Sequence, residues 1–216
     1  MSSQSLFPSY SLRERQLDQV VHALALAATL VAIPLLFGVA EPWNDATRLV
    51  ACLLYSFGLL WMWSFSAAYN SALEERRREI LRRFDHAGIF LMIAGSYSPF
   101  ALVKIGGGWG LGVFLFIWAL AGLGLFLALR YPRSSDRASM LLCLIMGWSI
   151  LLLIKTLIEA VSTAVFVLLV VGGLLFTGGI GFHLAKSLRY HNAIWHAFVL
   201  SAAVCHYLAI FLALRV

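Results

Sequence analysis

Two short groups of polar residues could carry chemistry in a chain that is otherwise strongly apolar. Asn192 and His196 are four residues apart, as are Ser66 and Asn70, so each pair would share one helix face. Asp85 opens another apolar stretch. Polar side chains are costly in hydrocarbon and usually face protein or water. A carboxylate, a hydroxyl, two amides and an imidazole at similar depth therefore predict one shared polar pocket.

The composition places these residues in a membrane protein. Of 216 residues, 62% are hydrophobic and 12% are charged, and the mean hydropathy is +0.89. Soluble domains are about half apolar and about a quarter charged. Short alternating segments are absent, which argues against a membrane β-barrel. The net charge of +6 is first an orientation signal, and no basic–aromatic interleaving indicates nucleic-acid binding.

Seven apolar runs approach the length of about 20 residues that a bilayer requires. They predict an all-α membrane protein with a seven-transmembrane helix bundle at 17–214, preceded by a cytoplasmic N-terminal segment at 1–16. The boundary between the fifth and sixth spans is the least defined, because only 155–159 separate them, and merging them would leave six. The expected spans are Leu17–Val39, Ala46–Tyr69, Phe84–Val103, Leu111–Arg130, Ala138–Ile154, Ala160–Phe182 and Ala193–Leu214.

The basic residues predict the orientation. With the N-terminus in the cytoplasm, twelve basic residues lie in cytoplasmic segments and four on the opposite side. Cytoplasmic loops normally carry this excess. We therefore expect a cytoplasmic N-terminus and an outside C-terminus in a multi-pass membrane protein. The connection from Ser71 to Arg83 predicts a short interfacial helix, which serves either as an anchor or as a contact for anionic lipid.

The polar residues lie in stretches that resemble a known family. These stretches are Ser66-x-x-x-Asn70, Leu81 to His86, Ile93 to Phe100, Gly147-Trp148 and His191 to Val199. Between about Trp61 and Leu208 the chain is similar to the hemolysin III family, within the progestin and adipoQ receptor (PAQR) superfamily, which itself resembles alkaline ceramidases. The resemblance implies a multi-pass protein of a bacterial inner membrane with a zinc site at its cytoplasmic end. Three imidazoles from the second and seventh spans would hold the metal, and an Asp opening the third span would orient or activate a water.

Two of the implied ligand positions carry asparagine. Asn70 and Asn192 stand where the resemblance implies zinc-ligating histidines, which leaves His196 with Asp85 and Ser66. Zinc prefers imidazole, thiolate or carboxylate over a neutral amide oxygen. His196 and Asp85 alone predict weak zinc binding. The alternative is a metal-free hydrogen-bond network in which the two amides fill the vacated space.

The other histidines are not expected to complete the site. His191 is rotated by about 100° from the next helical position, and His206 lies roughly 15 Å deeper than His196. We expect His206 to form an interhelical hydrogen bond and His183 to lie at the interface. His22, in the first span, is expected to be a packed or snorkelling histidine.

Three functions are compatible with this sequence. The first is a membrane protein acting in membrane lipid homeostasis or signalling, with a lipid or fatty acid in the bundle. The alternative is a zinc-dependent hydrolase of a lipid amide or ester, in which Asp85 acts on water, His196 ligates and Ser66 steadies the oxyanion. A cytolytic pore is least favoured, because no span carries a polar stripe along its length. Membrane lipids are the expected partners.

Overall fold

The computed structural model describes residues 10–131 and 136–215, and these residues form helices and no strand. Within these described ranges, seven helical segments are long and apolar enough to cross a membrane, as predicted. The helices are α1 (Leu12–Ala40), α2 (Ala46–Ser71), α3 (Glu75–Pro99), α4 (Gly107–Arg130), α5 (Asp136–Trp148), α6 (Ile154–Ala160), α7 (Thr163–Leu184) and α8 (His191–Leu214). Three short helical segments complete the described chain: η1 (Pro42–Asn44), η2 (Phe100–Ile105) and η3 (Ser149–Leu153).

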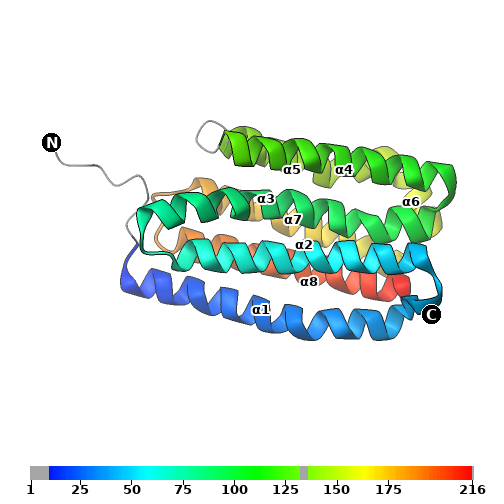
Figure 1. Cartoon of the computed structure of the whole chain (residues 1–216), viewed down its shortest axis with the longest axis horizontal. Helices are drawn as coiled ribbons and strands as arrows, with labels where there is room; N and C mark the ends of the chain where they lie inside the picture. Colours follow the sequence, from blue (N-terminus) through cyan, green and yellow to red (C-terminus); the bar gives the residue numbers. More distant parts are fainter. Residues whose placement is uncertain (1–9, 132–135, 216) are drawn as a thin grey trace.

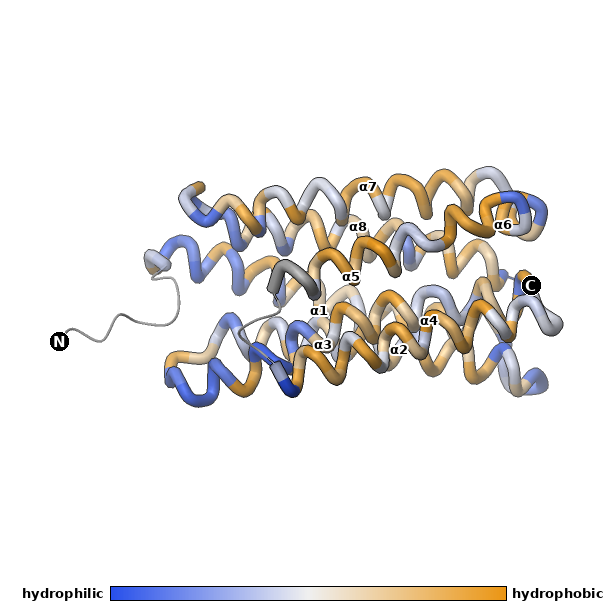
Figure 2. Tube along the Cα trace, turned by 90° about the horizontal axis from the view of Figure 1, so that it is seen from above, coloured by the Kyte–Doolittle hydropathy of each residue, from blue (hydrophilic) through white to orange (hydrophobic). Residues whose placement is uncertain are grey.

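The helices run side by side in one bundle, in which α3 belongs to the most buried span (Figure 1). α1 packs against α2 and α8, α2 packs against α3, and α7 packs against α8, while α4 and α5 cover α3 from the other side. Hydrophilic residues gather at the helix ends and hydrophobic residues fill the middle (Figure 2), as hydrocarbon surroundings require. The end at which α1, α3 and α8 begin is termed the polar end below.

Two glycines let α2 and α3 approach closely. A Cβ atom at Gly58 would lie 2.7 Å from the carbonyl oxygen of Leu91, and one at Gly95 would lie 2.9 Å from that of Leu54. Both distances are shorter than van der Waals contact, so neither position accepts a side chain without a backbone shift. Small residues commonly bring membrane helices together in this way. The contact holds α2 firmly against α3, and these two helices carry residues of the predicted pocket.

Tyr97 joins α3 to the interruption between α5 and α6. The helix changes there to the 3-10 segment η3, which alters the partners of the local backbone groups. The hydroxyl oxygen of Tyr97 lies 2.8 Å from the carbonyl oxygen of Met146 and accepts a hydrogen bond from the N–H of Ile150 at 3.0 Å. Backbone polar groups in hydrocarbon need internal partners. Tyr97 therefore supplies partners where the helix is interrupted.

The connection between the fifth and sixth spans is not where the sequence predicts it. Residues 155–159 are helical and form most of α6, which completes the fifth span. α7 begins directly after Ser162, whose side chain accepts a hydrogen bond from the N–H of Val165. Lys155 and Glu159 are exposed, so these charges remain solvated or near headgroups at the tip of a continuing helix. The capping serine, rather than the charged residues, marks the boundary.

The predicted interfacial helix over 71–83 is not a separate element. The chain turns at 72–74, and α3 then runs without interruption from Glu75. α1 begins at Leu12, within the expected N-terminal segment 1–16, of which residues 1–9 lie outside the described part. The orientation of the bundle relative to the cytoplasm stays a prediction.

Candidate functional site

α1 delivers a carboxylate and an imidazole to the inside of the polar end. The helix begins with a capping box, in which the Ser11 side chain accepts from the N–H of Glu14 and the Glu14 carboxylate accepts from the N–H of Ser11. Further along, Asp18 and His22 face the bundle and are only 4% and 3% exposed. Their spacing of four residues places them on one helix face.

His196 of α8 meets both residues of α1. Its Nδ1 atom lies 2.5 Å from Oδ1 of Asp18, and its ring centroid lies 4.4 Å from that of His22. One possible ligand atom from each of Asp18, His22 and His196 lies within 4.8 Å of the other two. Imidazole and carboxylate are ligand types that divalent transition metals favour. These three buried side chains, termed the buried triad below, could therefore hold a metal ion.

Both imidazoles of the buried triad present Nε2 to the hydroxyl of Ser66 on α2. The Ser66 Oγ atom lies 3.0 Å from Nε2 of His22 and 3.5 Å from Nε2 of His196. On the far side of each ring, Nδ1 contacts an oxygen of Asp18, which for His22 is the carbonyl oxygen at 2.8 Å. If Nδ1 is assigned as the donor in neutral rings, each Nε2 carries a lone pair. Two buried lone pairs then compete for one hydroxyl proton, and a bound cation would satisfy both.

A second protonation state fits the same contacts without a metal. A protonated His196 would form an ion pair with Asp18 and donate its Nε2–H toward Ser66. The hydroxyl of Ser66 would in turn donate to His22. Every member of the network would then have a partner, as buried polar groups require. The same geometry is therefore compatible with a metal-bound state and a protonated, metal-free state, and a measurement of metal content distinguishes the two.

Asn70 and Asn192 lie together beside the buried triad. The side-chain amide of Asn192 donates to Oδ1 of Asn70 at 3.0 Å, and that of Asn70 donates to the carbonyl oxygen of Ser66 at 2.9 Å. The two positions at which the family resemblance implies histidines are thus neighbours in space. Neutral amides occupy them and bond to each other without placing further charge in the bundle.

A polar chamber of about 170 Å³ opens beside the buried triad. Asp85, Asn70, Asn192 and His196 line it together, whereas Ser66 does not line it and lies behind His196, which it contacts. The structure thus brings the predicted site residues to one region of the polar end. Three basic side chains and two tyrosines also line the chamber, namely Arg78, Arg82, Lys186, Tyr10 and Tyr69. Burial raises the pKa of the Tyr10 phenol to about 12, so this residue stays neutral at physiological pH.

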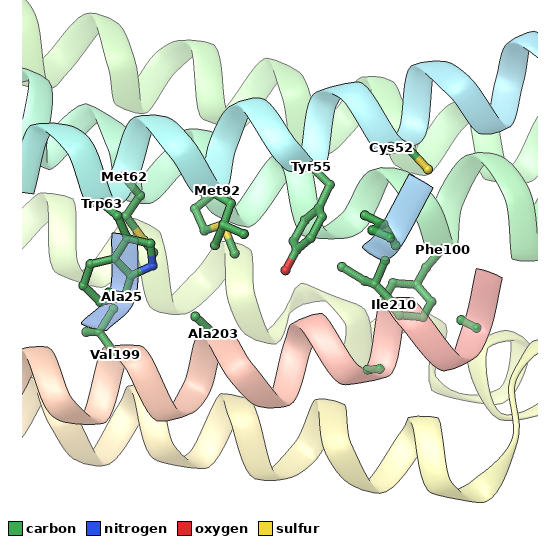
Figure 3. Packing of buried hydrophobic residues seen from close by; sticks show 14 of the residues in the cluster. Ala25, Cys52, Tyr55, Met62, Trp63, Met92, Phe100, Val199, Ala203 and Ile210 are labelled. Carbon is green, nitrogen blue, oxygen red and sulfur yellow. The ribbon is translucent and has the colours of Figure 1, made fainter. Parts of the chain in front are cut away.

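An apolar cavity of about 130 Å³ lies deeper in the bundle. Its lining includes Met62 of α2, Met92 of α3, and Val199 and Ala203 of α8, which lie close together in Figure 3. Met62 is four residues from Ser66, and Val199 is three residues from His196, so the cavity begins about one helical turn beyond the polar site. Its size and lining suit a hydrocarbon chain. His206 is one of its few polar lining residues.

The sequence interpretation does not anticipate the part played by α1. It treats His22 as a packed or snorkelling histidine, whereas the structure places this residue beside His196 and Ser66. The signal that could have revealed it is spacing. Asp18 and His22 are four residues apart, as are Ser66 and Asn70 on α2. A carboxylate and a histidine four residues apart inside an apolar run share one helix face. Like the other polar pairs, they could have been predicted to face the polar pocket.

Comparison with known proteins decides the family. The model described as Haemolysin-III related matches residues 10–207, which is most of the chain. The chain belongs to the haemolysin-III-related family. It is 31% identical over 192 residues to Hemolysin-3 of Bacillus cereus, covering 89% of this chain and 88% of that one. It is 27% identical over 201 residues to the Hemolysin-3 homolog of Bacillus subtilis, covering 93% and 94%.

The haemolysin-III-related chain is also similar to a human protein. It is 25% identical over 197 residues to monocyte to macrophage differentiation factor, covering 88% of this chain and 79% of that one, which agrees with the expected link to the PAQR superfamily. The seven apolar helices and the family make it a multi-pass integral membrane protein. Its bacterial relatives support the predicted location in a bacterial inner membrane.

The haemolysin-III-related chain offers a metal a different ligand set from the one that the resemblance implies. The implied set of three imidazoles is reduced to His196, because Asn70 and Asn192 replace the other two. The buried triad instead combines His196 with Asp18 and His22 of α1. Two imidazoles whose Nε2 atoms face the same hydroxyl, with a carboxylate on their Nδ1 side, fit the chemistry of a divalent metal site.

Proposed function

We propose that this protein is a metal-dependent hydrolase that cleaves an amide or ester bond of a membrane lipid, with zinc as the metal. The observation that carries the proposal is the convergence of Asp18, His22 and His196, which are buried and whose ligand atoms lie within 4.8 Å of one another. In this arrangement the Nε2 atoms of His22 and His196 would bind the metal, and Asp18 would orient both rings from their Nδ1 side. When bound, the metal polarises a substrate carbonyl as a Lewis acid.

The chain's own residues orient the substrate and move the proton. Asp85 shares the chamber with His196, and there its carboxylate accepts a proton from the attacking water and returns it to the leaving group. Ser66, whose Oγ faces both imidazoles, donates a hydrogen bond to the developing oxyanion. Asp18 holds the His196 ring in one orientation, as carboxylates behind metal-ligating histidines do.

The apolar cavity supports a lipid as the substrate. It begins about one helical turn beyond the polar site and is lined mostly by apolar side chains such as Met62, Met92 and Val199. A hydrocarbon chain in this cavity would leave its polar end beside His196. A water-soluble amide would gain nothing from such a cavity, because burial of apolar surface supplies the affinity.

A second candidate is a lipid-binding protein without catalysis that acts in membrane lipid homeostasis or signalling. The observation that favours it is the contact of 2.5 Å between His196 and Asp18, which an ion pair satisfies without a metal. In this case the polar network fixes α1 against α8, and the cavity alone binds lipid.

Metal content separates the two candidates. We expect the purified protein to hold about one zinc per chain, and His22→Gln and His196→Gln to lose it. His206→Gln is the matched control, because this residue lines the apolar cavity and lies outside the buried triad. Elemental analysis gives the stoichiometry, and thermal unfolding in detergent checks that each variant is folded. A folded wild-type protein that takes up no zinc from a buffered solution would contradict the hydrolase proposal.

Turnover tests the chemistry separately. The zinc-loaded protein is incubated with a panel of lipid amides and lipid esters, and released fatty acid is measured. Hydrolysis that requires both zinc and His22 would support the proposal. Zinc binding without turnover of any lipid in the panel would favour the lipid-binding role.

A further inference from the structure

Four of the five arginines at the start of α3 fall into two groups, and the fifth, Arg83, contacts Glu79 and the carbonyl oxygen of Leu129. Arg76 and Arg77 are exposed, as residues that serve only as an orientation signal would be. Arg78 and Arg82 are partly buried and line the polar chamber, together with Lys186 from the connection between α7 and α8. An arginine that only sets the orientation of the protein in the membrane does not need to line a cavity.

The chamber carries more positive than negative charge. Among its described lining residues, three are Arg or Lys, and Asp85 is the only carboxylate. The guanidinium of Arg78 lies over the ring of Tyr69, 5.5 Å from its centroid, which holds it at the chamber wall. Cationic groups that line one cavity attract and concentrate an anion there.

Residues on one face of α3 line the two cavities in a definite order. Arg78, Arg82 and Asp85 line the polar chamber, and Ile89 and Met92 line the apolar cavity. They follow each other at intervals of three or four residues, so they form one stripe along the helix. At about 1.5 Å per residue, Arg82 precedes Asp85 by roughly 4.5 Å and Ile89 follows it by roughly 6 Å. Basic, acidic and apolar groups therefore succeed one another over roughly 10 Å of the helix.

We propose that Arg78 and Arg82, with Lys186 at the rim, bind the phosphate of a lipid headgroup, so that the substrate is an acyl ester or amide of a phosphate-bearing lipid. This rests on the proposed hydrolase function for the identity of the cleaved bond. The stripe matches such a molecule, because its phosphate would lie at the arginines, its carbonyl near Asp85 and His196, and its chain in the apolar cavity. Arginine suits this role, since its planar guanidinium pairs with two phosphate oxygens at once.

Short-chain lipids test the headgroup directly. Binding of dihexanoyl phosphatidate, dihexanoylglycerol and inorganic phosphate to the purified full-length protein is measured by calorimetry. We expect phosphatidate to bind at least about tenfold more tightly than either of the others. The double variant Arg78→Gln/Arg82→Gln should lose about tenfold or more of that affinity, because each lost charge-assisted hydrogen bond is costly. Arg76→Gln, an exposed arginine on the same helix, should leave it unchanged.

The outcomes separate the sources of the phosphate and the two proposals. Equal affinity for phosphatidate and dihexanoylglycerol in the wild type would overturn the phosphate site. Inorganic phosphate that binds as tightly as phosphatidate would assign the site to free phosphate and overturn the lipid headgroup. Arg82→Lys keeps the charge but cannot pair with two phosphate oxygens at once. It should bind phosphatidate more weakly than the wild type and more tightly than Arg78→Gln/Arg82→Gln, and this graded loss separates headgroup binding from misfolding. His22→Gln should still bind phosphatidate more tightly than dihexanoylglycerol. The phosphate site can therefore be tested even if the proposed metal site is wrong.

Discussion

His22 of the first span and His196 of the last span face each other with ring centroids 4.4 Å apart, and both direct Nε2 toward the hydroxyl of Ser66. Asp18 contacts the Nδ1 side of both rings. Three helices thus contribute to one buried polar centre. Because each ring is held on its Nδ1 side, the two Nε2 atoms are the groups available to a ligand.

The first prediction concerns the ligand set. His22→Gln should weaken zinc binding by at least about a hundredfold, since loss of a mere supporting contact already costs about ten- to a hundredfold. Adding Asn70→His and Asn192→His to this variant should restore zinc binding, because the two asparagines contact each other at 3.0 Å and lie beside His196. Zinc competition with a fluorescent chelator measures both steps.

The control for this rescue is the same pair of substitutions with His196→Gln in place of His22→Gln. This triple variant should stay deficient, because both ligand sets share His196. A folded rescue variant that binds no zinc would show that the asparagine positions cannot complete a site with His196.

The second prediction separates proton transfer from metal binding. Asp85→Asn should lower lipid turnover by about a hundredfold to ten-thousandfold, the usual contribution of a general base. Zinc stoichiometry should stay unchanged, because Asp85 lies outside the buried triad. Turnover is followed by released fatty acid and zinc by elemental analysis. Full activity in Asp85→Asn would remove this residue from the mechanism.

The third prediction concerns the apolar cavity. Ala203→Phe places a ring in a cavity of about 130 Å³ that Ala203 lines, and should weaken binding of a long-chain lipid while leaving zinc in place. Val204→Phe is the matched control, because Val204 is 44% exposed at the outer face of α8. Displacement of a fluorescent fatty acid measures the difference. Equal binding by both variants would mean that the chain lies elsewhere.

The fourth prediction tests the contact between α2 and α3. Gly58→Ala should destabilise the protein by about 1–3 kcal/mol, because the new methyl group meets backbone atoms that must shift. Gly112→Ala should be neutral, since a Cβ atom at Gly112 meets nothing within 4 Å. Unfolding in mixed micelles compares the two variants. A neutral Gly58→Ala would mean that α2 and α3 are held less closely than the structure indicates.

The spans were predictable because length and hydropathy leave few alternatives in a bilayer. The boundary at α6 was not, because Lys155 and Glu159 at a helix tip resemble a loop, whereas the capping side chain of Ser162 is what starts α7. The predicted interfacial helix failed for a related reason. An amphipathic stretch that reaches the membrane surface can simply continue into the span that follows it, as α3 does from Glu75.

The candidate site was predictable on α2, α3 and α8, where Ser66, Asp85 and His196 belong to quoted family stretches. Asp18 and His22 lie outside those stretches, so the resemblance gave no reason to consider them. They are the ionisable residues of the expected first span, 17–39. Their role depends on the packing of α1 between α2 and α8, a tertiary contact that helical periodicity within one segment does not encode.

The position of the buried triad on α1 and α8 has a consequence for biogenesis. A ribosome completes Asp18 and His22 almost first and His196 almost last, and the rest of the bundle is made in between. Asp18 and His22 of a nascent chain therefore lack their partner His196 until the last of the six following spans has been made. The centre can therefore form only after α8 is made, and a copy truncated before α8 would keep Asp18 and His22 in the bilayer without His196.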